Sequence, residues 1–68
     1  MNQDRLSLDI HEFLKVVGVT SQREIERALR DALVGGALAE DAVLTPRVTL
    51  LVPEIGLEHV VDGEIGMT

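Results

Sequence analysis

The sequence predicts an α+β domain in which two N-terminal helices pack on one face of a C-terminal β-hairpin. Apolar residues recur at helical spacing before residue 35, and they alternate from residue 47 onward. Glycines and a proline separate the two regions. A chain of 68 residues without cysteine fits one small domain with no disulfide. We therefore expect a single domain over residues 1–68.

The first helix is predicted at about residues 8–17. Placed at about 100° per residue, five apolar side chains share one face: Leu6, Ile10, Phe13, Leu14 and Val17. Ser7 is the expected N-cap because its hydroxyl can accept a hydrogen bond from a free backbone amide. Gly18 stands where a left-handed residue would end the helix.

The second helix is predicted at about residues 22–34. It starts at a capping box, in which Ser21 and Glu24 satisfy each other's backbone amides. Its apolar face is continuous and consists of Ile25, Ala28, Leu29, Ala32 and Leu33. Gly35 and Gly36 then stop the helix. The short connection makes the two helices neighbours in a helical hairpin or a helix-turn-helix.

The remaining chain is predicted to form a surface connection and a β-hairpin. Residues 37–46 show no sustained period and end at a proline. Residues 47–52 and about 57–62 alternate as strands, and the second strand can extend to Ile65. Residues 53–56 form the four-residue loop between the strands.

Alternation assigns each strand residue to one of two faces. The face expected to cover the helices carries Val48, Leu50, Val52, Leu57, His59 and Val61. Leu51 and Val60 then lie on the outer face. An isolated hairpin has two unpaired edges and is marginally stable. We therefore expect a homodimer that forms through the hairpin edge or through the outer face with Leu51 and Val60, although scattered apolar surface residues also occur without a partner.

Composition excludes several functional classes. The net charge is −6 and Phe13 is the sole aromatic residue, which disfavours nucleic acid as a partner. The N-terminus lacks a signal-peptide pattern, and no apolar run approaches a membrane span. The expectation is a cytoplasmic protein without a membrane partner.

No residue pattern predicts a catalytic, cofactor or metal site. His11 and Glu12 resemble the start of a zinc-protease motif, but Lys15 occupies the position where the second histidine is needed. No serine or threonine has a base at a recognised nucleophile spacing. We therefore predict a small non-enzymatic protein-interaction module that self-associates through its hairpin and has no cofactor.

DNA binding is the alternative function. The segment 13–29 could form a helix-turn-helix, with the hairpin as a wing and with Arg23, Arg27 and Arg30 facing a DNA groove. Against this, three acidic residues neutralise that helix, and residues 37–68 contain six acids and one arginine. In addition, Leu14 and Glu24 depart from the residue types of the usual motif.

Segment 13–29, and most specifically Lys15-Val-Val-Gly-Val-Thr-Ser-Gln-Arg-Glu-Ile-Glu, resembles a family of short bacterial proteins classed only as domains of unknown function. The resemblance extends to the closing segment Val60-Val-Asp-Gly-Glu-Ile. It implies a stand-alone cytosolic bacterial protein and transfers no catalytic or ligand residue. His59 departs from the apolar or aromatic residue expected there.

Overall fold

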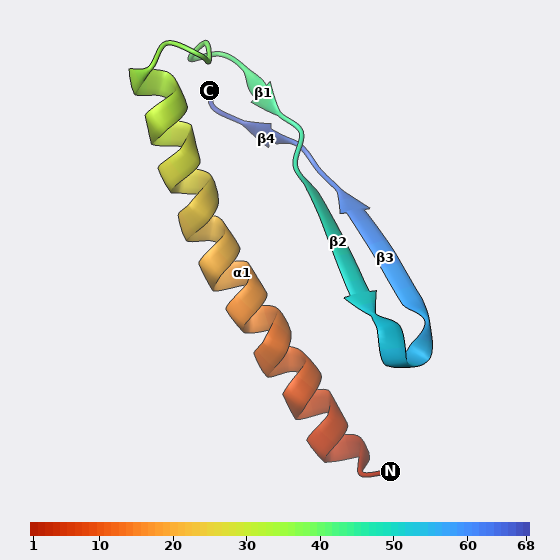
Figure 1. Ribbon diagram of the computed structural model, residues 1–68. Coiled ribbons are helices and arrows are strands. Elements are labelled where there is room, and N and C mark those ends of the chain that lie inside the picture. The colour runs from red at the N-terminus through yellow and green to blue at the C-terminus, as the bar shows by residue number, and fades with distance from the viewer. The chain divides into compact units, whose positions relative to one another are not determined.

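The computed structural model describes all residues from Met1 to Thr68. The chain divides into two compact units, Met1–Ala37 and Leu38–Thr68. The first unit is helical and the second consists of antiparallel strands, as Figure 1 shows. The α+β class is therefore correct.

The first unit is one helix, α1, which spans Gln3–Val34. It begins at Asn2, whose side-chain oxygen accepts a hydrogen bond from the backbone amide of Arg5 at 3.0 Å. Asp4 lies in the first turn, where a negative charge is favourable to the helix dipole. The predicted start at residue 8 and the predicted N-cap at Ser7 are wrong, because Asn2 caps the helix earlier.

The prediction of two helices is also wrong, because α1 continues through residues 18–21. Gly18 costs a helix interior only about 1 kcal/mol relative to alanine. The Thr20 hydroxyl donates to the backbone oxygen of Val16 at 2.8 Å, so this side chain is satisfied inside the helix. Neither Gly18 nor Ser21 caps a helix end, and the segment contains no proline to force a break.

The end of α1 agrees with the prediction. Gly36 has a φ of 71°, the left-handed conformation that glycine adopts without strain. Its amide donates to the oxygen of Leu33 at 3.2 Å, and the amide of Ala37 donates to the oxygen of Ala32 at 3.0 Å. These two bonds form a Schellman motif, which satisfies carbonyls that the helix leaves free.

The predicted hairpin is confirmed. Strands β2 (Arg47–Val52) and β3 (Leu57–Asp62) are antiparallel, with Val48 opposite Val61 and Leu50 opposite His59. The loop is a 3₁₀ turn, η1 (Pro53–Ile55), closed by Gly56 at a φ of 63°. This loop could be predicted from sequence because Pro53 favours the first position of a turn and Gly56 adopts the left-handed conformation without strain.

Two further strands were not predicted. β1 (Val43–Leu44) pairs with β4 (Ile65–Gly66), so the segment before Pro46 is not wholly a loop, and β3 does not extend to Ile65. The β1–β4 pairing keeps the register of β2 and β3. Between the two ladders, the amide of Gly63 donates to the oxygen of Pro46 at 3.1 Å. The strands thus form one interrupted antiparallel ribbon.

Neither unit contains a buried residue. Hydrophobic residues make up 46% of the chain, yet even its most covered side chains are only half-buried. Hydrophobic burial is the dominant favourable contribution to folding. Each unit therefore leaves most of its apolar side chains exposed to solvent.

Candidate interaction surfaces

The first candidate surface is an apolar stripe along α1. It follows spacings of four, four and three residues, which is an 11-residue repeat and keeps to one face of a helix. The stripe residues are Leu6, Ile10, Leu14, Val17, Ser21, Ile25, Ala28 and Ala32, with Phe13, Leu29 and Leu33 beside them. Phe13 is 55% exposed. The stripe continues through residues 18–21, where the sequence predicted a turn, and its member there is the half-buried polar residue Ser21.

The second candidate surface is one face of the β2–β3 ribbon. The register places Val48, Leu50 and Val52 on the same face as Leu57, His59 and Val61, as predicted. Leu50 and Val52 are half-buried, whereas Val48 and Val61 are 47% and 52% exposed. We call these six residues the apolar face of the hairpin.

The opposite face is mixed in character. Leu51 and Val60 lie on it, as predicted, and are 63% and 45% exposed. On the same face Arg47 donates from Nε to Asp62 Oδ1 at 2.7 Å, an exposed ion pair across the strand ends. The structure thus brings Leu51 and Val60 together, but among polar neighbours.

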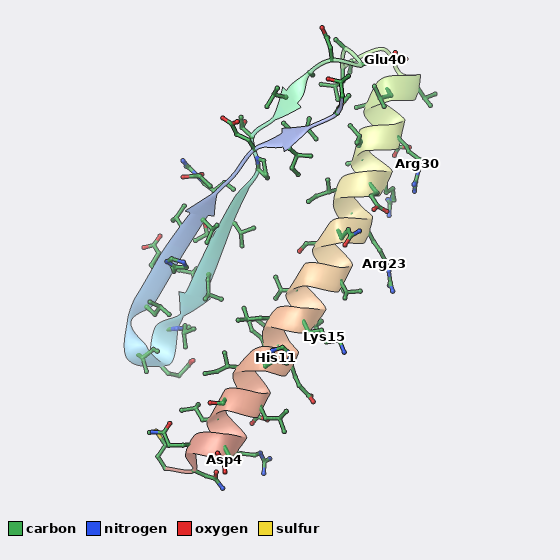
Figure 2. The ribbon with its side chains drawn as sticks, turned by 180° about the vertical axis from the view of Figure 1, so that it is seen from behind. Asp4, His11, Lys15, Arg23, Arg30 and Glu40 are labelled. Carbon is green, nitrogen blue, oxygen red and sulfur yellow. The ribbon has the colours of Figure 1, made fainter.

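The predicted arginine cluster lies on the surface of α1. Figure 2 shows Lys15, Arg23 and Arg30 on the same side of the helix. Arg27 Nη1 lies 3.9 Å from Glu24 Oε2, so part of this positive charge is neutralised within α1. The helix-turn-helix and wing arrangement is wrong, because no turn separates residues 13–17 from residues 22–29. The DNA-binding alternative therefore loses the motif on which it rested.

The chain contains no group of three or more His, Cys, Asp or Glu side chains that could hold a metal ion. His11 and His59 lie in separate units. One surface depression is lined by α1 residues alone and another by residues 45–47 and 62–64. In the first depression, the Thr20 hydroxyl donates to the backbone oxygen of Val16 and not to the His11 or Glu12 side chain.

Sequence reasoning missed the continuity of the stripe. The signal was present in the spacing from Leu6 to Ala32, because Leu6, Val17 and Ala28 stand 11 residues apart, as do Ile10, Ser21 and Ala32. Reading residues 6–17 and 25–33 as separate faces concealed this repeat. Gly18 and Ser21 are residue types that often end or begin helices, but here α1 continues through both of them.

Comparison with known proteins gives a family but no activity. No curated protein and no solved structure matches the chain. The single helix does not have the length of apolar sequence that is needed to cross a membrane. A model of a family of unknown function, DUF6494, matches residues 1–68. The chain therefore belongs to this family of unknown function, in agreement with the resemblance found in the sequence.

Proposed function

We propose that the protein is a small non-enzymatic interaction module whose folding is coupled to self-association. The observation that carries this proposal is the absence of any buried residue in a chain that is 46% hydrophobic. A domain this small gains little stability from its own core and depends on an added constraint. It has no disulfide, so a partner chain is the remaining common solution.

Each unit exposes large apolar side chains. In α1, Ile10 and Phe13 are 51% and 55% exposed, and in the strand unit Val48 and Val61 are 47% and 52% exposed. A stable interface commonly buries about 800 Å² per partner, and permanent dimers bury more. These side chains support a partner chain that covers them.

Native mass tests this proposal. We expect size-exclusion chromatography with light scattering to give at least twice 7.4 kDa across a concentration series. Refractive index must be used for detection, because the chain lacks Trp and Tyr. A mass of 7.4 kDa at every concentration, with a cooperative thermal transition, would reject self-association.

The hairpin contribution is tested by comparing its two faces. Val61→Lys places a charge on the apolar face, and Leu51→Lys places the same charge on the mixed face. We expect Val61→Lys to lower the native mass and Leu51→Lys to lower it less, because lysine is tolerated beside polar neighbours. Val60→Lys is a second test of the mixed face.

The opposite order would assign the interface to Leu51 and Val60. Equal loss of mass in both variants would mean that the assembly covers both faces of the hairpin. No change in either variant would remove the hairpin from the interface and leave α1 as the contact. Helical circular dichroism must be recorded for each variant, so that unfolding is distinguished from dissociation.

A further inference from the structure

We infer that two copies of this chain pair through the free edge of β2, in antiparallel orientation and centred on Thr49. The pairing joins the two hairpins into one four-stranded sheet in the order β3, β2, β2, β3. This inference rests on the proposed self-association and names the edge and the register that it uses. The hydrogen-bond pattern and the charges of the two edges select this arrangement.

The ladder between β2 and β3 leaves a row of free backbone groups on each side. The amide of Gly63 donates to the oxygen of Pro46 at 3.1 Å, and these two residues continue the register of β2 and β3. Hydrogen-bonded and non-hydrogen-bonded pairs alternate in an antiparallel ladder, so the next pair, Arg47 with Asp62, is not hydrogen-bonded. The residues with outward amides and carbonyls are Arg47, Thr49 and Leu51 on β2, and Glu58, Val60 and Asp62 on β3. None of them takes part in a backbone hydrogen bond outside the ladder.

Acidic side chains oppose pairing through the edge of β3. Glu58 and Asp62 flank Val60 on that edge, and Glu58 has no ion-pair partner. A two-fold axis perpendicular to the sheet pairs a strand with its own copy in antiparallel orientation. In every such register that joins the outward groups of β3, carboxylates of the two copies stand directly opposite or on the diagonal. Like charges at such short range destabilise a strand pair, and charged side chains commonly protect an edge.

The edge of β2 lacks this obstacle. Its only charged residue is Arg47, whose Nε already lies 2.7 Å from Asp62 Oδ1 of the same hairpin. The strand contains no glycine or proline, and its valine and threonine residues favour extended backbone. A second copy of β2 can therefore satisfy the outward amides and carbonyls of this edge.

A charge and a proline determine the register. Centred on Thr49, the pairing sets Thr49 opposite its own copy and Arg47 opposite Leu51 of the second copy. A centre one residue nearer the N-terminus sets the two Arg47 side chains on the diagonal, where like charges repel. A centre one residue nearer the C-terminus sets Arg47 opposite Pro53, which has no amide to donate and begins η1.

The same register extends the apolar face of the hairpin across both copies. Val48 becomes the neighbour of Leu50 of the second copy. One row across the sheet then consists of Val61 and Val48, followed by Leu50 and His59 of the second copy. Independent stability of a sheet needs three or more strands with an apolar face. Edge pairing therefore supplies both the missing hydrogen bonds and a wider apolar face.

Proline substitutions test which edge is used. Thr49 and Val60 stand directly opposite each other, and both have outward amides. Thr49→Pro removes an edge amide without removing a hydrogen bond of the hairpin, and Val60→Pro does the same on β3. Thr49→Pro should weaken self-association by about tenfold or more, because both symmetric hydrogen bonds at the centre are lost. Val60→Pro, the matched control, should leave the native mass unchanged.

The opposite order would assign the interface to β3 and overturn the inference. Equal weakening by both prolines, with the circular dichroism of the wild type retained, would overturn it as well. An unchanged native mass in both variants would show that neither edge is paired, and would leave self-association through side-chain faces intact.

Amide hydrogen exchange in the wild-type chain tests the same edge without a substitution. Corrected for sequence, the outward amides of β2 should exchange at least about tenfold more slowly than the outward amides of β3, because only the former are hydrogen-bonded in the assembly. Equal exchange in the two rows of a dimer would overturn edge pairing alone. Equal exchange together with a monomer mass would reject self-association itself.

Disulfide cross-linking tests the register. The chain has no cysteine, so Thr49→Cys and Leu51→Cys each introduce one thiol. Centred on Thr49, the two copies of position 49 lie about 5.5 Å apart between Cα atoms, which is within the range of a disulfide. The two copies of position 51 lie about 14 Å apart. Under mild oxidation Thr49→Cys should form a covalent dimer and Leu51→Cys should not. Cross-linking of Leu51→Cys in preference to Thr49→Cys would overturn the register.

Discussion

Val17→Asp is expected to dissociate the assembly and to reduce the helical signal of the chain. Val17 is half-buried at the centre of the stripe, one residue before Gly18. Loss of its apolar burial costs roughly 2 kcal/mol per chain, and burial of an unpaired carboxylate adds further cost. Together these effects weaken a dimer by at least about 1,000-fold. Light scattering and circular dichroism measure the two results.

Val16→Asp is the matched control. Val16 is the adjacent residue of the same type, but it is 59% exposed and lies about 100° away around the helix. The same substitution there should leave the native mass unchanged. If both variants dissociate the assembly equally, the stripe is not the contact surface. If neither does, α1 is not part of the interface.

Gly18→Pro is expected to cause a loss of stability of about 3 kcal/mol or more, because proline removes a backbone donor and clashes with the preceding turn of a helix. Gly18 lies in the interior of α1, and a Cβ added there meets no atom within 4 Å. Gly18→Ala should instead stabilise the protein by about 1 kcal/mol. Chemical denaturation followed by circular dichroism measures both changes.

The alanine variant decides between one helix and two. In a continuous helix, alanine is favoured over glycine at every interior position. At a left-handed helix end, alanine would be disfavoured because its Cβ meets the backbone. Destabilisation by Gly18→Ala would therefore contradict the continuous helix and support a turn at residues 18–21.

The hairpin could be predicted from sequence because its signals are local. Alternation from Arg47 to Val52, followed by Pro53 and Gly56, specifies the strand, the loop and the register together. The short strands β1 and β4 could not be predicted. A strand of two residues is too short to show alternation. The pairing of β1 with β4 continues the register of the longer strands past Pro46 and Gly63.

The break in the helix was predicted wrongly because capping residues were read without their surroundings. Gly18, Ser21 and Glu24 match a helix end followed by a helix start, but each is also tolerated inside a helix. The apolar face that continues past them keeps the spacing of one helix from Leu6 to Ala32, and this longer pattern has greater weight than local capping signals. The same misreading divided the apolar face of α1 into two short faces, whereas the helix is continuous from Gln3 to Val34.

The melting temperature as a function of protein concentration tests the coupling of folding to association most directly. For two 68-residue chains that fold only together, a 100-fold increase in concentration should raise the melting temperature by roughly 10 °C. Circular dichroism at 222 nm follows the transition without an aromatic chromophore. A cooperative transition whose midpoint does not change with concentration would contradict the account and show that one chain folds alone.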